Sequence, residues 1–396
     1  MRVLHCITRM IVGGAQENTL FNCLDLAERY RDEVLLVTGP SIGAEGDLLS
    51  RMDTKSVRVN VIDPLRRNIH PKHDFKAYRA LQEMIRTWKP DVVHTHSAKA
   101  GLLGRAAAWK SNVPAVIHTV HGAPFHPYQR AMSRWFFIAC ERWAANRCHR
   151  LISVADAMTD LMVSARVAPR EKFTTVYSGM DVEPFLRSET HRTEMRQQLG
   201  FEPDDVVFGK IARLFHLKGH EYVFAAARRV IEHVPTAKFL MVGDGLLRDA
   251  FEAQVAHSEL AGRVVFTGLV SPSEIPKYLS AMDVLVHASL REGLARALPQ
   301  ALIAGKPAIS FDIDGAREVV IHGATGCLVP ACDVERLAQA MIELGLSADQ
   351  RSAFGHEGRQ RFTDRFRHET MTERIRAEYE RLLNPHASKG SSPKST

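Results

Sequence analysis

Short apolar runs alternate with amphipathic, helix-like stretches along nearly the whole chain of 396 residues. This alternation is typical of parallel strands joined by crossover helices, and it predicts an α/β protein with helices packed on its sheets. The expected strands are 3–7, 34–38, 57–62, 92–95, 115–120, 151–154, 173–177, 206–212, 238–242, 264–267, 284–287 and 308–311. Twelve strands are many for one sheet, so we expect two doubly wound domains.

A polar stretch at 188–205 separates the two sets of strands and predicts a linker. The expected domains are therefore 1–187 and 206–362. A charged, amphipathic helix should follow at 363–383, and it can cross back to the first domain. The tail 384–396 is rich in Ser, Lys and Pro without apolar periodicity, which predicts disorder.

The composition is that of an ordinary globular protein, with 45% hydrophobic and 24% charged residues. The six cysteines show neither a C-x-x-C pair nor zinc-ligand spacing, so we expect reduced thiols and no metal site. No uncharged apolar run reaches the roughly 18 residues that span a bilayer, and the first residues lack the features of a signal peptide. The expected location is cytoplasmic, with peripheral binding at the inner face of the membrane as an open alternative.

Positive charge is concentrated in the first half of the chain. The net charge is +7, yet residues 51–150 alone contain 18 Lys and Arg against 6 Asp and Glu. A basic face of this kind suits an acidic lipid surface, a phosphorylated substrate or nucleic acid.

Two adjacent glycines, Gly13 and Gly14, follow the first expected strand and precede a helical stretch. Without side chains they let backbone N–H groups approach a phosphate, and the helix N-terminus adds a favourable dipole. The spacing is not the GxGxxG of a dinucleotide fold, so a simple strand-to-helix turn is the competing interpretation.

Two cations, Arg213 and Lys218, come just beyond the expected strand 206–212. A guanidinium fork and an ammonium group at the carboxyl end of a strand suit a diphosphate, because ligands of open α/β sheets bind at that edge. The alternative is that both are solvated surface charges.

A single carboxylate, Glu292, lies in the loop 290–294 between the strand 284–287 and a helical pattern that ends at Gly305. Its place at the carboxyl end of a strand indicates a ligand-binding role. The competing interpretation puts Glu292 in the first helical turn, where it would only complement the helix dipole.

Taken together, these segments resemble the glycosyltransferases of family 4 over residues 1–383. The matching segments are Gly13-Gly14-Ala15, Arg213 to Lys218 before Gly219, Val242-Gly-Asp-Gly245, and Glu292-Gly293 leading to Ala304-Gly-Lys-Pro307. The resemblance implies a GT-B fold, with two Rossmann-like doubly wound parallel-sheet domains facing a central cleft. It also implies retaining sugar transfer from a UDP-sugar or GDP-sugar to a hydroxyl, without a metal or another cofactor.

The resemblance assigns most donor-binding residues to the second half. In the family's E-x7-E motif the first acid, here Glu292, hydrogen-bonds the donor sugar and is counted as catalytic. The second acid commonly holds the ribose, but here the position is Gln300, whose amide can still bond hydroxyls without a full charge. The remaining expected donor-binding residues are Gly13, Gly14, Arg213, Lys218, Gly293, Leu294 and Ala295.

The resemblance also gives roles to residues at the ends of strands in the first half. His121 matches a position that approaches the donor sugar and the reaction centre. His94, His96 and Lys99 are expected on the acceptor side. For His94 and His118 the alternative is a core histidine satisfied by internal hydrogen bonds. The segment Tyr177–Asp181 resembles the family's domain junction, which predicts a hinge.

The segment 125–150 carries five arginines and several aromatic side chains on a helical pattern. Such a helix can lie on an anionic bilayer, and many family 4 relatives use lipid-linked or envelope acceptors. The competing interpretation packs the aromatic residues against a sheet. The expected partners are thus a nucleotide sugar, a hydroxyl acceptor that can be lipid-linked and an anionic membrane surface, but not nucleic acid.

Three other function classes remain open at this stage. Asp312 and Asp314 could form the DxD of a metal-dependent glycosyltransferase. A nicotinamide dehydrogenase is disfavoured by the absent GxGxxG. A non-catalytic nucleotide-sugar-binding protein is suggested only by Gln300.

Overall fold

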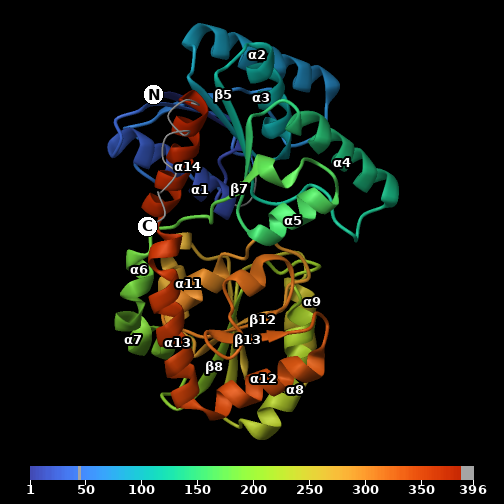
Figure 1. The fold of residues 1–396 in the computed structure, drawn as a ribbon. Helices are drawn as coiled ribbons and strands as arrows, with labels where there is room; N and C mark the ends of the chain where they lie inside the picture. Colours follow the sequence, from blue (N-terminus) through green and yellow to red (C-terminus); the bar gives the residue numbers. More distant parts are fainter. Residues whose placement is uncertain (43–45, 385–396) are drawn as a thin grey trace, which may run out of the picture. The chain divides into compact units, whose positions relative to one another are not determined.

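The computed structural model describes residues 1–42 and 46–384, and the chain forms two compact units (Figure 1). The first unit comprises residues 1–180 and the chain from Phe366 on, and the second comprises 181–365. The expected hinge segment Tyr177–Asp181 contains the boundary at 180/181. The predicted disorder at 384–396 falls almost entirely outside the described residues.

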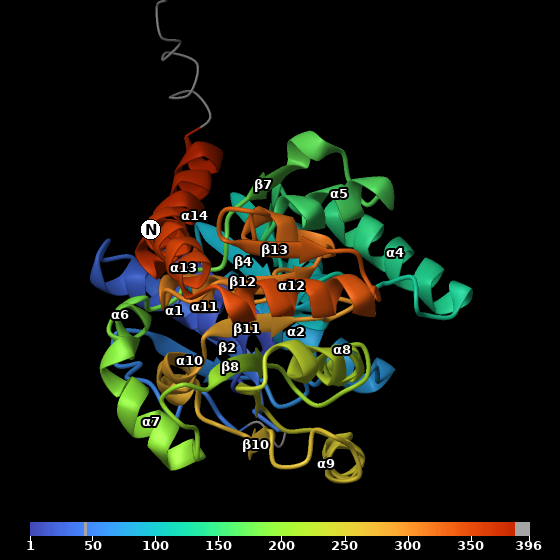
Figure 2. The same cartoon turned by 90° about the horizontal axis from the view of Figure 1, so that it is seen from below.

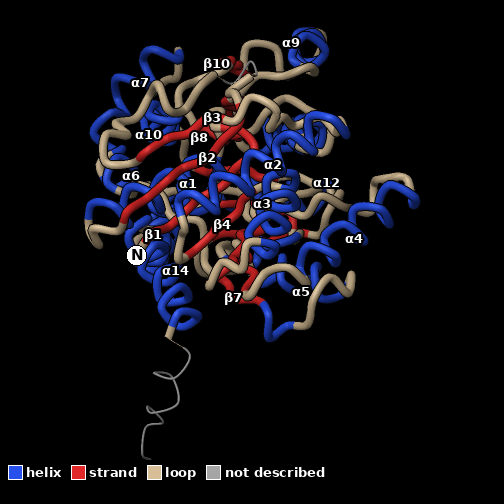
Figure 3. The backbone as a smooth tube through the Cα atoms, turned by 90° about the horizontal axis from the view of Figure 1, so that it is seen from above, coloured by secondary structure: helices blue, strands red, loops and turns tan. Residues whose placement is uncertain are grey.

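The first unit contains a parallel sheet of seven strands in the order β3-β2-β1-β4-β5-β6-β7 (Figure 3). Its strands are β1 (Arg2–Arg9), β2 (Glu33–Gly39), β3 (Arg58–Val61), β4 (Val92–His96), β5 (Ala115–Val120), β6 (Arg150–Ser153) and β7 (Phe173–Thr175). Its helices are α1 (Gly14–Glu28), α2 (Pro71–Trp88), α3 (Ala98–Lys110), α4 (Ala131–Ala145), α5 (Asp156–Ser164), the short 3-10 helix η1 (Arg170–Lys172) and α14 (His368–Leu383). The seven strands predicted for this half are all present.

Helices pack on both faces of this sheet because successive side chains of a strand point to opposite faces. Val3 and Ile7 pack in one core with apolar residues of α1 and α14. Cys6 faces the other way, and a Cβ at Gly104 of α3 would lie 3.7 Å from its side chain. The helix α14 packs directly on α1, although the two are far apart in sequence (Figure 1).

The second unit contains a parallel sheet of six strands in the order β10-β9-β8-β11-β12-β13 (Figure 2). Its strands are β8 (Val206–Ile211), β9 (Ala237–Val242), β10 (Val264–Gly268), β11 (Val284–His287), β12 (Ala308–Phe311) and β13 (Gly326–Val329). Its helices are α6 (Glu183–Leu186), η2 (Ser188–His191), α7 (Arg192–Leu199), α8 (His220–His233), α9 (Arg248–Ala256), η3 (Pro272–Glu274), α10 (Ile275–Ala281), α11 (Ala297–Ile303), η4 (Asp314–Glu318), α12 (Val334–Leu346) and α13 (Ala348–Phe362), and η5 (Asp364–Phe366) ends at the boundary.

Both sheets reverse their strand order next to the first strand, as in Rossmann folds. The reversal lies between β1 and β4 in the first unit and between β8 and β11 in the second. At such a switch point the connecting loops run to opposite sides, and the carboxyl ends of the two strands leave room for a ligand. Each unit therefore has one preferred edge for a binding site.

The structure corrects two expected elements. The strand β13 was not predicted, because it is short and starts at Gly326, where a Cβ would lie 1.9 Å from the carbonyl oxygen of Ala308. The helix expected over 363–383 begins only at His368, after η5 and a β-bridge between Met180 and Arg367.

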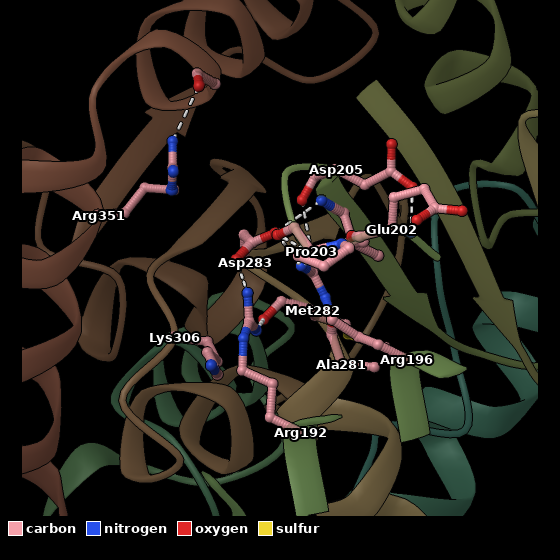
Figure 4. Close-up of polar contacts among 12 residues, drawn as sticks. Arg192, Arg196, Glu202, Pro203, Asp205, Ala281, Met282, Asp283, Lys306 and Arg351 are labelled. Atoms are coloured by element: carbon pink, nitrogen blue, oxygen red, sulfur yellow. Dashed lines mark hydrogen bonds and ion pairs between the residues drawn. The ribbon is translucent and has the colours of Figure 1, made fainter. Parts of the chain in front are cut away.

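The stretch 188–205, expected as a linker, forms η2 and α7 and packs into the second unit (Figure 4). Asp283 accepts hydrogen bonds from Arg192 at 2.5 Å and from Arg196 at 2.9 Å, and also from the backbone N–H of Val207 at 2.7 Å. Arg196 in addition donates to the carbonyl oxygen of Pro203 at 2.8 Å. One carboxylate thus ties α7 to the first strand of the sheet.

The six cysteines all lie in the described part of the chain and form no disulfide, and four of them are buried. No helix in the described ranges combines the length and the apolar character needed to cross a bilayer.

Candidate functional site

The carboxylate of Glu292 lies at the switch point of the second unit, in the loop that follows β11. The helix α11 begins at Ala297, so Glu292 precedes it by a full turn and more. The interpretation that placed Glu292 in the first helical turn is therefore wrong. The side chain is 20% exposed and faces two other polar groups of the same edge.

Glu292 forms an ion pair with Lys218, whose Nζ lies 2.5 Å from its Oε1. The Nε2 atom of His287, the last residue of β11, lies 3.5 Å from the same oxygen. Burial would raise the pKa of Glu292, but the contact with His287 and the charge of Lys218 outweigh burial and hold this pKa well below its usual range. The carboxylate is therefore charged and oriented.

Backbone contacts hold the loops of this edge together. The N–H of Leu290 donates to the carbonyl of Leu217 at 2.9 Å, which joins the loop after β11 to the loop after β8. Gly219 has a φ of +69°, and a Cβ there would lie 1.8 Å from the carbonyl oxygen of Ala288. Only glycine fits this close approach, because any side chain would push the two loops apart.

The predicted donor-binding residues of this unit lie around these loops. Arg213 is exposed, with its guanidinium carbon 5.1 Å from the centre of the Phe215 ring, and it has no acidic partner among the described residues. Gly293 and Leu294 are partly exposed, whereas Ala295 is buried. Gln300 lies on α11, is partly exposed and makes no side-chain hydrogen bond to any described residue.

The two carboxylates of the suggested DxD segment do not converge. Asp312 pairs with Arg317, with Nε and Nη2 at 3.0 and 2.8 Å from its two oxygens. Asp314 adopts a φ of +44° and accepts the backbone N–H of Glu292 at 2.6 Å. Burial raises the pKa of Asp314. Asp314 therefore positions the loop that carries Glu292, whereas Asp312 holds Arg317.

A buried polar group underlies the site and was not predicted from the sequence. Lys210 of β8, His220 at the start of α8 and His287 are each nearly inaccessible. Lys210 Nζ, His220 Nδ1 and His287 Nδ1 have no hydrogen-bond partner within the described ranges. Burial lowers the pKa of Lys210 to about 7 and that of His220 to about 2. The sequence signal that could have revealed this buried group is Lys210, a lysine inside the otherwise apolar strand β8.

In the first unit His94 belongs to the core. It is fully buried, and its ring nitrogens bond to the Tyr379 hydroxyl at 2.6 Å and to Thr119 at 2.7 Å. Burial, with a smaller effect of His5, holds its pKa well below the usual value. The acceptor-side role predicted for His94 is thus corrected to a structural one. His118 is likewise buried and bonds to Thr95 at 2.9 Å.

His96 links a buried histidine to His121. His5 Nδ1 lies 3.0 Å from His96 Nε2, and His96 Nδ1 lies 3.0 Å from His121 Nε2. Burial lowers the pKa of His5 to about 3 and that of His96 well below its usual value, so both rings are neutral. The buried His5 Nε2 has no partner in the described chain, which favours leaving the proton on Nδ1. The protons then point toward His121, and the chain of bonds orients its ring.

The nitrogens of His5, His94 and His96 also lie within 4.8 Å of one another. Both ring nitrogens of His94 and both of His96 already take part in hydrogen bonds, and only His5 Nε2 has no partner among the described residues. The arrangement is therefore better explained as a packed histidine cluster than as a metal centre.

The other predicted residues of the first unit lie at the same sheet edge. Gly13 and Gly14 form the turn into α1, as the simple-turn interpretation also requires. The Thr8 hydroxyl bonds to the Ser97 hydroxyl at 2.7 Å and joins the ends of β1 and β4. Lys99 pairs with Asp74 at 2.6 Å and also donates to the carbonyl of Asn68.

Two family models match the chain, "Glycosyl transferase 4-like domain" over residues 20–179 and "Glycosyl transferases group 1" over 191–361. An Escherichia coli protein named UDP-Gal:alpha-D-GlcNAc-diphosphoundecaprenol alpha-1,3-galactosyltransferase is 31% identical over 87% of this chain and 88% of its own length. This chain belongs to the family 4-like glycosyltransferases.

Other relatives agree with this assignment. The 2-deoxystreptamine N-acetyl-D-glucosaminyltransferase of Streptomyces fradiae is 29% identical to this glycosyltransferase over 83% of the chain and 82% of the relative. Among solved structures, HepE of Anabaena in complex with UDP superimposes with a TM-score of 0.80 over 96% of this chain and 99% of HepE, at 22% identity. That likeness shows the fold, and the predicted pair of Rossmann-like GT-B domains is confirmed.

The helix α4 of the glycosyltransferase exposes most of its apolar side chains. Met132 is 85% exposed and Trp135 71%, and Phe136 is also exposed, whereas only Glu141, Ala144 and Ala145 are buried. Arg134 and Arg142 are exposed on the same helix. The interpretation that packs these aromatic residues against a sheet is wrong for Trp135 and Phe136.

Proposed function

We propose that this glycosyltransferase moves a hexose from a UDP-sugar to a hydroxyl of a sugar that is carried on a lipid diphosphate, in envelope polysaccharide or glycolipid synthesis. The observation that carries the proposal is the charged Glu292 held by Lys218 at the switch point of the second unit. The name of the E. coli relative specifies UDP-Gal as its donor and a diphosphoundecaprenol-linked GlcNAc as its acceptor, which supports the choice of donor and acceptor here.

The second unit binds the donor in this proposal. Arg213 and Lys218 contact the diphosphate, because both cations lie just beyond β8 and Arg213 has no acid to neutralise it among the described residues. Glu292 accepts hydrogen bonds from hydroxyls of the sugar. Gln300 bonds the ribose, and the loop at 293–295 supplies backbone N–H groups.

The transfer proceeds with retention and without a metal. The bond between the anomeric carbon and the leaving phosphate oxygen breaks as the acceptor oxygen approaches on the same face. The acceptor hydroxyl proton moves to that phosphate oxygen, so UDP leaves and a glycosidic bond forms. Arg213 and Lys218 stabilise the charge that develops on the diphosphate, while His121, oriented by His96, contacts the donor sugar.

Acceptor-dependent release of UDP tests this function. Purified protein is incubated with UDP-galactose, UDP-glucose, UDP-N-acetylglucosamine or GDP-mannose, with a short-chain polyprenyl diphosphate GlcNAc in detergent. We expect UDP release from at least one UDP-sugar only when the acceptor is present, with equal rates in EDTA and in Mg²⁺. Strict dependence on a divalent ion would revive Asp312 and Asp314 as metal ligands. Donor binding without turnover would favour the non-catalytic alternative that Gln300 suggests.

We also propose that α4 attaches the protein to an anionic bilayer. Its exposed Met132, Trp135 and Phe136 can enter the interface between head groups and acyl chains, while Arg134 and Arg142 meet anionic lipid. Each exposed arginine near such a surface contributes about 1 kcal/mol, and salt screens that contribution.

Co-sedimentation with vesicles measures this attachment. We expect binding to phosphatidylglycerol vesicles at low salt, weaker binding at high salt and little binding to phosphatidylcholine. The double change Met132→Ser and Trp135→Ser should lower partitioning by at least about tenfold, because burial of each side chain contributes about 1.5 to 3 kcal/mol. Leu346→Ser, at an exposed leucine of the second unit, is the matched control. Equal binding of both variants would exclude α4 as the membrane contact.

A further inference from the structure

We infer that the first unit holds the diphosphate of the acceptor in a basic cavity at the end of β1, with the lipid leading from there across an apolar wall to α4. This inference rests on the proposed function, because it assigns a place to the acceptor. The cavity has a volume of about 510 Å³ and is lined by Thr8, Arg9, Pro40, Ile42, Arg66, Arg67, Asn68, His70 and His73.

The charge of this cavity is unbalanced. Three guanidinium groups line it, and none of its lining residues carries a carboxylate. Arg66 is bound to Asp63 at 2.9 Å in an exposed ion pair. Arg9 donates only to the carbonyl of Ile42, at 2.9 Å, and Arg67 has no partner in the described part of the chain. Two guanidinium groups that have no acidic partner among the described residues thus lie beside one cavity, and they favour a multiply charged, oxygen-rich anion.

The segment that carries Arg67 is attached to the rest of the unit. Lys99 of α3 pairs with Asp74 of α2 at 2.6 Å and donates to the carbonyl of Asn68. The positive charge of Lys99 is therefore neutralised by Asp74. Lys99, predicted on the acceptor side, is then a positioning residue that holds the Arg67 segment, and Arg9 and Arg67 supply the net charge.

A second cavity of about 560 Å³ continues from the first, since Thr8, Arg9 and Arg67 line both. Its lining includes the apolar residues Ile69, Leu102, Leu103, Pro124, Phe136 and Phe137. It also includes two carboxylates, but Asp74 is paired with Lys99 and Glu141 with Arg105. Phe136 belongs to the exposed face of α4 as well. The surface thus begins at Arg9 and Arg67, continues along the apolar residues and ends at the helix proposed to meet the bilayer. A diphosphate with a hydrocarbon tail has the same order of charged and apolar parts.

Direct binding of farnesyl diphosphate tests the site without requiring turnover. Binding is measured by calorimetry for the full chain, for Arg9→Ala, for Arg67→Ala and for the double variant. Arg79→Ala is the control, since Arg79 is exposed on α2 and lines neither cavity. Each single change should weaken binding about 10- to 150-fold, the loss of one charge-assisted hydrogen bond, and Arg67→Lys should restore part of it.

Three further ligands separate the sources of binding. Inorganic diphosphate should bind more weakly than farnesyl diphosphate, but its affinity should depend on the two arginines in the same way. Binding of farnesol, which has no diphosphate, should not depend on the arginines. The affinity for UDP should change less than about twofold in all variants if the second unit binds the nucleotide. Unchanged farnesyl diphosphate binding in the double variant, or an equal loss for UDP, would overturn the inference. Arginine-dependent binding without any UDP release would retain the site and reject the proposed function.

Discussion

Glu292→Gln is expected to lower kcat for sugar transfer by about 10- to 150-fold while the affinity for UDP changes less than about twofold. The carboxylate lies beside Lys218 and is charged, so it can accept strong hydrogen bonds from hydroxyls of the donor sugar. Loss of one such bond of about 1.5 to 3 kcal/mol at the transition state gives this range. UDP lacks the sugar, so its binding should be nearly normal.

The matched control is Glu232→Gln, which alters an exposed acid on α8 of the same unit. Turnover and UDP affinity should be unchanged in that variant. If Glu292→Gln turned over as fast as the parent protein, Glu292 would have only a structural role. A parallel fall in UDP affinity and in kcat would place its contact on the nucleotide instead.

Arg213→Ala and Lys218→Met should both weaken binding of UDP and of the UDP-sugar by about 10- to 150-fold, with uridine binding unaffected. The reason is that both cations act on the diphosphate in the proposed donor site. Lys218→Met should weaken the binding of UDP and of the UDP-sugar more than Arg213→Ala does, because it also leaves the partly buried Glu292 without its partner at 2.5 Å. Calorimetric titration with the three ligands measures the difference.

Arg228→Ala, which removes an exposed arginine of α8, is the control for lost positive charge. It should leave all three affinities unchanged. A fall in uridine affinity equal to the fall in UDP affinity would indicate a folding defect in the Arg213 or Lys218 variant. A fall in the Arg228 variant would indicate that net charge, rather than the two cations, governs binding.

Local patterns in the sequence were sufficient for most of the fold. A strand buried on both faces of a parallel sheet is a short apolar run, and the helix between two strands keeps a helical period, so neither depends on knowing the neighbours. The strand β13 was not predicted, because its apolar run is short and begins with Gly326. The same logic located Arg213, Lys218 and Glu292, since residues that follow a parallel strand must lie at its carboxyl edge.

Tertiary structure decided which of the predicted polar residues can reach a substrate. His94 and His96 share a face of β4, but the contact of His94 with Tyr379 joins residues 285 positions apart, so the sequence gives no sign of it. The hydrogen bond from the N–H of Glu292 to Asp314 depends on the loop after the next strand, β12. The exposure of Trp135 is likewise a tertiary property, because it depends on which other elements pack against α4.

The sequence by itself therefore determined all the parallel strands except β13, the division into two sheets and the edge at which each site lies. It did so because backbone pairing and side-chain periodicity act over a few residues. Only the tertiary structure brought Arg9 to Arg67, separated Asp312 from Asp314 and buried Lys210 beneath the site. Those contacts join residues distant in sequence, and their free energy comes from packing and desolvation that no local pattern records.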